Sequence, residues 1–195
     1  MSFGIRNATA DDIEKIMEIE KSAFIPEIQE NRGLFMERIE LFQKGFLIFF
    51  EKESGKTAGY LSSELWKKVP SSETAFSIGH EIKDFHCDDG SVLYISSFAI
   101  LPGFRGQGNG LAFFSMALDY IRQSVPSMEY ALLLVNEKWQ AALKIYGQYG
   151  FAEKFRIENV FPDGAGNYSD GIVMALSVKI SEPHDCISQQ PLLGK

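Results

Sequence analysis

A glycine-rich turn between an apolar strand and a helix is the segment of this sequence best suited to chemistry. Arg105 begins the turn, and Gly106, Gly108 and Gly110 follow at alternate positions. Glycine allows positive φ and a close backbone approach to a ligand, and the unpaired N–H groups at the start of the next helix attract anions. The Arg105 guanidinium adds a permanent positive charge. The turn is therefore predicted to be an anion seat that suits a phosphate group.

The spacing of the glycines separates this turn from two well-known phosphate loops. Its order is G-x-G-x-G, whereas a dinucleotide-binding loop has G-x-G-x-x-G, and the Gly-Lys-Ser/Thr of a P-loop is missing. The pattern that does match is Arg-x-x-Gly-x-Gly over residues 105–110, directly after a strand and Pro102. This pattern resembles the GNAT superfamily of acyl-CoA-dependent N-acetyltransferases.

A second motif farther along the chain supports the same resemblance. Asn136 ends an apolar run and is followed by a helix with paired alanines, Tyr146 and then Gly-Phe at 150–151. Both motifs are similar to those of the superfamily, and the first helical region is loosely similar to its bacterial arylalkylamine and polyamine acetyltransferase members. We therefore expect a GNAT domain over residues 1–178 and a loosely ordered tail over 179–195.

The resemblance implies that acetyl-CoA is the co-substrate. In the family the turn holds the CoA pyrophosphate, the preceding strand hydrogen-bonds the pantetheine arm, and one main-chain N–H, here near Phe98, binds the acetyl oxygen as charge develops. Trp139 stands where the family often has a second Asn, so we expect it to pack on the cofactor or the core. Asn136 could equally serve only to form a turn. The residues expected to bind the cofactor are Phe98, Ala99, Ile100, Arg105, Gly106, Gln107, Gly108, Asn109, Gly110, Asn136 and Trp139.

The resemblance also assigns catalytic roles. Tyr146 is in register with the tyrosine that often protonates the departing CoA thiolate, which suits a phenol; the alternative is that its ring only packs on the sheet. Ser96 and Tyr94 stand where some relatives carry His. Neither is a base at neutral pH, so we expect them to anchor a water chain that carries the amine's proton to a carboxylate or solvent. His80 and His86 are expected to be surface residues.

The acceptor site is expected under the first two helices, which roof it in the family. Phe24, Glu27 and Phe35 are predicted to bind the amine, and the acidic segment that contains Asp88 and Asp89 is predicted to attract its positive charge. The alternatives are that the aromatic rings fill the core and that the charges form a solvated face.

Strands and helices alternate in a way that positions these residues. Strands are predicted at 4–7, 46–51, 57–66, 91–101, 130–135, 151–161 and 171–178, and helices at 9–24, 32–43, 109–124 and 138–149. This order predicts an α/β fold of GNAT type, a mixed, mostly antiparallel sheet of about seven strands flanked by about four helices. The parallel pair would be 91–101 with 130–135.

Composition narrows the class of protein. The chain has 195 residues, of which 45% are hydrophobic, which suits one domain with a full core. The net charge of −7 argues against binding to nucleic acid. The apolar runs are too short for a membrane span, and no signal peptide is evident, so a cytoplasmic protein without membrane partners is expected. The two cysteines lack metal-ligand spacing, so no metal is expected.

These observations predict an N-acetyltransferase that moves an acetyl group from acetyl-CoA to a primary amine by direct attack in a ternary complex. The acceptor is expected to be a small molecule. Two alternatives stay open, namely a non-catalytic acyl-CoA-binding or regulatory GNAT module and an enzyme that acetylates a peptide N-terminus or a lysine. The sequence identifies neither the amine nor the general base, and it leaves open whether the chain forms a homodimer.

Overall fold

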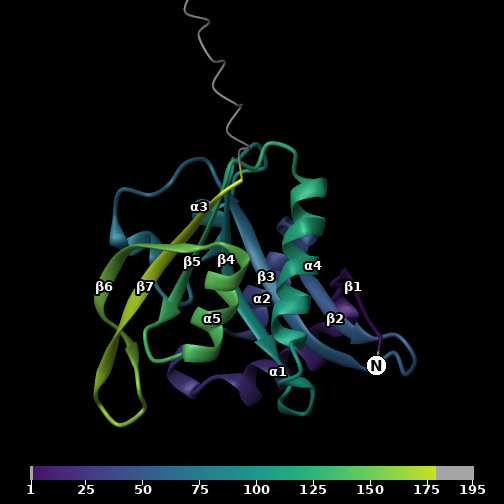
Figure 1. Ribbon diagram of the computed structural model, residues 1–195. Helices are drawn as coiled ribbons and strands as arrows, with labels where there is room; N and C mark the ends of the chain where they lie inside the picture. The colour runs from purple at the N-terminus through teal and green to yellow at the C-terminus, as the bar shows by residue number, and fades with distance from the viewer. Residues whose placement is uncertain (1, 179–195) are drawn as a thin grey trace, which may run out of the picture.

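A computed structural model describes residues 2–178 of the chain (Figure 1). Met1 and residues 179–195, and with them the predicted tail, lie outside the described part. Within that part, seven strands form one sheet in the order β1-β2-β3-β4-β5-β7-β6. The strands are β1 (Phe3–Asn7), β2 (Leu47–Glu51), β3 (Thr57–Trp66), β4 (Val92–Ile100), β5 (Tyr130–Asn136), β6 (Ala152–Pro162) and β7 (Tyr168–Ser177). The helices are α1 (Ile13–Ala23), α2 (Arg32–Leu41), α3 (Ile82–Phe85), α4 (Asn109–Ser124) and α5 (Gln140–Tyr149).

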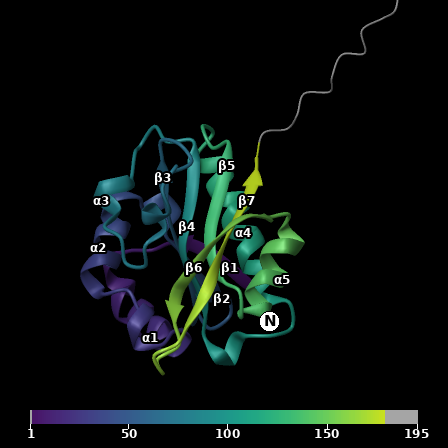
Figure 2. The ribbon, with the colours of Figure 1, turned by 90° about the vertical axis from the view of Figure 1, so that its left-hand side faces the viewer.

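The helices cover both faces of the sheet. Figure 2 shows α1, α2 and α3 on one face and α4 and α5 on the other. Apolar residues of α4 recur at three- and four-residue intervals, and Phe113, Phe114 and Leu118 are buried against the sheet. On the opposite face Ile16 of α1 and Phe35 of α2 belong to a second buried cluster. The sheet thus has a hydrophobic core on each face, and a further buried cluster includes Trp66, Phe76 and Tyr94.

The strand pairing confirms the predicted fold class. Every neighbouring pair is antiparallel except β4 and β5, which run parallel and are joined through α4. Element ends differ from the predictions by a few residues. α2 stops at Leu41 because the 3₁₀ turn Gln43–Gly45 follows it. β7 starts at Tyr168, earlier than predicted, because its ladder with β6 continues to Pro162.

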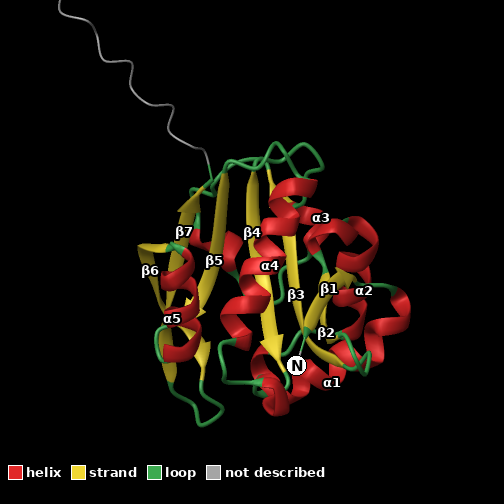
Figure 3. Ribbon diagram, turned by 45° about the vertical axis from the view of Figure 1, so that its right-hand side comes forward, coloured by secondary structure: helices red, strands yellow, loops and turns green. Residues whose placement is uncertain are grey.

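β4 and β5 separate halfway along their length. They pair only over Val92–Ile95 and Tyr130–Leu133. At this point the register of β4 against β3 shifts, because Ser62 faces Ser97 whereas Ser63 faces Ile95, which leaves Ser96 as an extra residue. Such a bulge bends a strand and increases its twist. Beyond it β4 follows β3 while β5 follows β7, and Figure 3 shows the two strands diverging.

Candidate active site

The backbone of β4 beyond the bulge presents unpaired groups toward β5. The Leu101 N–H donates to the Ala58 carbonyl at 2.8 Å, which fixes the residues of β4 that bond to β3. Because hydrogen-bonded pairs alternate in an antiparallel ladder, Ala99 also points its N–H and C=O toward β3, while Phe98 and Ile100 point theirs the other way. Phe98 therefore offers an N–H on the side that β5 has left, in the position predicted for an oxyanion donor.

Ala99 corrects one prediction. Its backbone groups bond to Tyr60 of β3, and its side chain is buried in the core under α1. It is therefore not available to the cofactor. Ile100, in contrast, has a carbonyl that accepts a hydrogen bond from Arg105 Nε at 2.8 Å, which ties the glycine turn to the end of β4.

The glycine turn has the conformation that the sequence predicted. Gly106, Gln107 and Gly108 have φ of 83°, 50° and 79°, and Gly108 is the N-cap of α4. A Cβ placed on Gly106 or Gly108 would meet no atom of the described chain within 4 Å, so the outer side of the turn is open. The α4 N-terminus and this run of left-handed residues direct N–H groups outward, as an anion seat requires.

Gly110 is required for a different reason. A Cβ at this position would lie 2.6 Å from Cδ1 of Ile145, so the absence of a side chain allows α4 and α5 to pack closely. Asn109 also acts within the protein, because its Nδ2 donates to the Phe104 carbonyl at 3.0 Å and closes the turn. Both residues shape the seat, whether or not they contact a ligand.

One pocket opens where the strands separate, and it reaches both faces of the sheet. Of the predicted site residues, Phe24, Tyr94, Ser96, Phe98, Trp139 and Tyr146 line it. Trp139 packs between Phe24 and Phe161, with ring centroids 5.6 and 5.2 Å away. These three rings come from the end of α1, the start of α5 and β6, and they form an aromatic roof.

Tyr146 combines burial with access to the pocket. Its ring packs against Phe98 and Phe114, with centroids 6.4 and 5.0 Å away. Burial raises its pKa well above the usual range, so the hydroxyl keeps its proton at neutral pH. The protonated hydroxyl can therefore hydrogen-bond to negative charge that develops beside it in the pocket, as on a departing thiolate, and can supply the proton as the thiol forms.

Tyr94 and Ser96 line the pocket with groups that also serve the fold. The Tyr94 ring stacks on Trp66 at 4.2 Å, and burial raises its pKa. Ser96 Oγ donates to the Ser62 carbonyl at 3.2 Å across the bulge. Neither group can accept a proton at neutral pH, as expected.

Glu20 is a buried carboxyl group at the pocket that the sequence analysis missed. It lies near the C-terminal end of α1, is 1% exposed and lines the pocket. Its Oε1 accepts from the Glu30 N–H at 2.8 Å, and its Oε2 accepts from the Tyr60 hydroxyl, which in turn contacts Ser97 Oγ at 2.7 Å. Burial raises the pKa of Glu20 to about 7, where a carboxylate is an effective general base. The only early sign is its spacing, because Glu20 follows Ile13 and Ile16 on the apolar face of α1.

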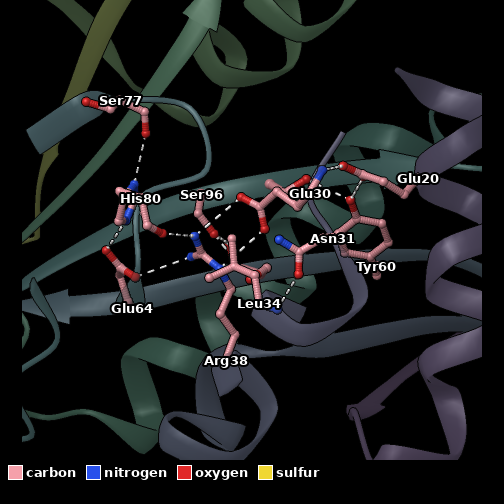
Figure 4. Close-up of polar contacts among 12 residues, drawn as sticks. Glu20, Glu30, Asn31, Leu34, Arg38, Tyr60, Glu64, Ser77, His80 and Ser96 are labelled. Atoms are coloured by element: carbon pink, nitrogen blue, oxygen red, sulfur yellow. Dashed lines mark hydrogen bonds and ion pairs between the residues drawn. The ribbon is translucent and has the colours of Figure 1, made fainter. Parts of the chain in front are cut away.

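A buried network of four charged side chains lies beside the pocket (Figure 4). Arg38 pairs with Glu30 through Nε and with Glu64 through Nη1, at 3.3 Å in each case. Glu64 Oε1 lies 2.6 Å from His80 Nε2 and also accepts from Trp66 Nε1 at 2.5 Å. We call Glu30, Arg38, Glu64 and His80 the buried tetrad. It joins the α1–α2 connection, α2, β3 and the segment before α3.

Both histidines contradict the prediction that they lie on the surface. The His80 side chain is 6% exposed because it packs on Tyr94 and bonds to Glu64. The His86 side chain is 7% exposed, and its Nδ1 accepts from the Leu65 N–H at 3.2 Å. Both were missed because they lie in a segment without periodic apolar residues.

Several predicted acceptor residues lie away from the pocket. Phe35 is fully buried against Phe46 and Tyr60, so it belongs to the core rather than to a binding surface. Glu27 is exposed beside Gly164 of the β6–β7 turn and does not line the pocket.

The two aspartates and Asn136 also serve local structure. Asp89 pairs with Lys67, and Asp88 contacts His86 at 3.2 Å, so both carboxylates lie in the exposed turn before β4. Asn136 Oδ1 accepts from the Lys138 N–H at 2.8 Å, which supports its turn-forming alternative.

No group of three or more His, Cys, Asp or Glu side chains within residues 2–178 is arranged to hold a metal ion. No helix in this range has the length and apolar character needed to cross a membrane.

Comparison with known proteins assigns the class. The model of the acetyltransferase (GNAT) family matches residues 13–151, so the chain belongs to this family. Comparison with curated protein sequences gives no significant match.

Solved structures share the fold at low sequence identity. The loading GNATL domain of CurA from Lyngbya majuscula is 14% identical with a TM-score of 0.75, over 91% of this chain and 98% of that one. The ribosomal-protein-S18-alanine N-acetyltransferase from Escherichia coli is 18% identical with a TM-score of 0.68, over 94% and 98%. The yncA protein from Salmonella typhimurium, with its cofactor acetyl-CoA, is 19% identical with a TM-score of 0.67, over 95% and 100%.

Proposed function

We propose that this protein transfers the acetyl group of acetyl-CoA to a small-molecule primary amine by direct attack in a ternary complex. The observation that carries the proposal is the convergence of Glu20, Phe98 and Tyr146 on one pocket where β4 and β5 separate. These residues supply a base, an oxyanion donor and an acid, and no covalent enzyme intermediate is needed.

The glycine turn and β4 are proposed to bind acetyl-CoA. The N–H groups at the α4 N-terminus and Arg105 would receive the pyrophosphate. The Phe98 carbonyl and the Ile100 N–H would bond to the pantetheine arm, because the Ile100 carbonyl already accepts from Arg105 Nε. The thioester would then lie between Phe98 and Tyr146.

Proton transfer from the amine is proposed to end on Glu20. Ser97 also lines the pocket, and its hydroxyl donates toward Tyr60, whose own hydrogen is given to Glu20. The chain from Ser97 through Tyr60 to Glu20 is therefore ordered in the direction that carries a proton out of the pocket. This route replaces the water chain expected at Tyr94 and Ser96 with protein hydroxyls.

The chemical step then balances. The neutral amine forms a bond to the acetyl carbon, and the carbonyl electron pair moves to oxygen, where the Phe98 N–H stabilises it. One oxyanion donor contributes about 3 kcal/mol. When the carbonyl re-forms, the C–S bond breaks and the nitrogen gives its extra proton to the Ser97–Tyr60–Glu20 chain. The CoA thiolate takes its proton from Tyr146, which regains one from solvent before the next turnover.

The aromatic roof favours a small acceptor over a peptide. Phe24, Trp139 and Phe161 close over the pocket. The β6–β7 turn approaches the α1–α2 connection so closely that a Cβ on Gly164 would lie 3.6 Å from Glu27 Oε1. This closeness leaves little room for an extended peptide to enter the pocket between these two segments. The S18-alanine enzyme acts on a protein, so a peptide acceptor remains the alternative to test.

A thiol-release assay tests the proposal. Purified full-length protein is mixed with acetyl-CoA and a panel of primary alkylamines, arylalkylamines, amino acids and peptides, and product is identified by mass spectrometry. Turnover with small amines is expected. Acetylation of peptides alone would replace the small-molecule acceptor, and tight acetyl-CoA binding without any turnover would favour a non-catalytic binding module.

A further inference from the structure

Several of the charged side chains around the acceptor side of the pocket neutralise one another, so they offer no net charge to a ligand. Glu20, Glu30 and His80 line the pocket, and Arg38 and Glu64 stand directly behind them. Their net charge decides how many positive groups an acceptor can bring into the pocket, so each must be counted with its partner.

The tetrad is electrically neutral as a unit. Arg38 and Glu30 form an ion pair. His80 Nδ1 lies 3.1 Å from the Ser77 carbonyl, which only accepts, so Nδ1 carries a hydrogen. The Nε2 contact with Glu64 at 2.6 Å holds one further proton, on the ring or on the carboxyl. In either form the His80–Glu64 pair has no net charge, so the tetrad leaves no carboxylate for a ligand.

Glu20 is the pocket carboxylate without a direct ion pair among the described residues, because the nearby cation Arg38, which acts on Glu20 at longer range, pairs with Glu30 and Glu64. Its carboxylate oxygens accept hydrogen bonds from a neutral backbone N–H and a neutral phenol. It can therefore receive one positive charge, and Glu20 is also the group that finally takes the proton.

The rest of the acceptor side carries no charge, because apart from the hydroxyl groups of Ser77, Ser96 and Ser97 it is apolar. Phe24, Ile28, Phe76, Ile78 and Phe161 line it from the α1–α2 connection, the segment before α3 and β6. A second ammonium group in this part of the pocket would be removed from water without an anion beside it, which is strongly unfavourable.

We propose that the acceptor is a primary monoamine with an aliphatic or aromatic body, and that amines with a second positive charge are poor acceptors. This inference rests on the proposed function and deepens it, because it separates the apolar amines from the polyamines to which the sequence is equally similar. The apolar body packs under the aromatic roof, the ammonium group lies at the Ser97 end of the hydroxyl chain, and the negative charge of Glu20 at the other end of that chain offsets it.

A pair of amines of equal length tests the inference on the full-length protein. Hexylamine and 1,6-diaminohexane differ only in the second amino group. We expect kcat/KM to be roughly 10- to 100-fold higher for hexylamine than for 1,6-diaminohexane, because the second ammonium group of the diamine would be buried without a partner. Equal use, or a preference for the diamine, overturns the inference and leaves the proposed function standing. Absence of thiol release with every primary amine overturns both.

A substitution at the pocket wall provides a gain-of-function test. Ile78 is 37% exposed, so the fold should tolerate a polar side chain there. Ile78→Glu adds a second carboxylate. It is expected to raise kcat/KM for 1,6-diaminohexane relative to kcat/KM for hexylamine by about tenfold, whereas the matched variant Ile78→Gln should leave this ratio unchanged. The same ratio in both variants and wild type would contradict the view that a missing second anion sets the preference.

Discussion

Glu20 shows how one buried side chain joins folding to chemistry. A carboxylate on the apolar face of α1 weakens the core, because burial disfavours its charged form. The same burial raises its pKa to about 7 and so makes it a useful base at neutral pH. The Tyr60 hydroxyl and the Glu30 N–H hold its two oxygens in place, so the carboxylate that lowers the stability of the fold also has a fixed position in the pocket.

Glu20→Gln is expected to reduce kcat by roughly 10²- to 10⁴-fold, as for loss of a general base. The amide keeps the shape and can accept from Tyr60 but cannot take a proton. In wild type the base is the ionised form, so kcat/KM at constant free-amine concentration should rise as pH passes about 7 and then level off. The variant should lack this rise.

The measurement is a pH–rate profile of both proteins with acetyl-CoA and hexylamine, with circular dichroism to show that each is folded. Glu18→Gln is the control, because Glu18 lies on the exposed side of the same helix and pairs with Lys15. A Glu20→Gln profile that retains the wild-type rise would assign the base elsewhere.

Tyr146→Phe is expected to keep the ring packing and to lower kcat by roughly 10²- to 10⁴-fold, with little change in KM for acetyl-CoA. The reason is that only the proton donor for the thiolate is removed. Tyr149→Phe is the control on the same helix, because its hydroxyl donates to Asp119 at 3.0 Å instead. A kcat within about twofold of wild type, with chemistry shown to limit the rate, would make Tyr146 a packing residue.

Residue types alone could predict part of this site. The glycine turn, Phe98 and Tyr146 are in recognisable motifs. The structure places Phe98 and Tyr146 in one pocket and the glycine turn at the start of α4. Glu20 could have been suspected from its spacing after Ile16. His80 could not, because its burial results from contacts with Glu64 and Tyr94, which are distant in sequence.

Among the elements, the β4–β5 pair explains why the site lies where it does. Apolar runs predicted both strands, and the connection through α4 predicted their parallel pairing. The point of separation could not be predicted, because it depends on a register shift against β3 at Ser96. Local propensity fixes a strand, whereas the end of its pairing is a tertiary property. The segment 67–90 likewise becomes ordered through buried contacts of Phe76 and Ile82 rather than through periodicity.

Gly108→Val is expected to weaken acetyl-CoA binding by at least about tenfold. Gly108 has φ of 79°, which a β-branched residue rarely adopts, and its open side faces the proposed pyrophosphate position. Binding is measured by isothermal titration calorimetry. Gly103→Val is the control, because position 103 has no positive φ and a Cβ there also meets no described atom within 4 Å. Unchanged affinity in a folded Gly108→Val protein would place the cofactor elsewhere.

Arg38→Met is expected to lower the free energy of unfolding by about 3–5 kcal/mol, because it leaves Glu30 and Glu64 buried without their cation. Urea unfolding at neutral pH measures the loss. Arg32→Met on the same helix is the control, because its pair with Glu14 is exposed and contributes about 0–1 kcal/mol. Equal losses in both variants would show that the tetrad does not hold α2 to β3.

At the scale of the whole molecule, the sheet separates two cores and the pocket passes between them. The glycine turn and α5 belong to one side, and Glu20 and the tetrad belong to the other. The two proposed substrates can therefore approach from opposite faces and meet where the strands separate. Such an arrangement suits direct transfer, because both substrates must be bound at once.

The net charge of −7 acts at this largest scale, and the structure changes its expected role. Asp88 and Asp89 lie in the turn before β4 and do not line the pocket, so they can attract a cation only through the long-range field. That field is screened within about 8 Å at physiological ionic strength.

Asp88→Asn with Asp89→Asn should therefore leave KM for hexylamine within about twofold of wild type at that salt concentration. Steady-state kinetics at low and physiological salt checks this, with Glu40→Gln plus Glu53→Gln as an exposed pair that changes the net charge equally. A several-fold rise in KM for hexylamine at physiological salt, seen in the aspartate variant alone, would show that Asp88 and Asp89 take part in binding the amine.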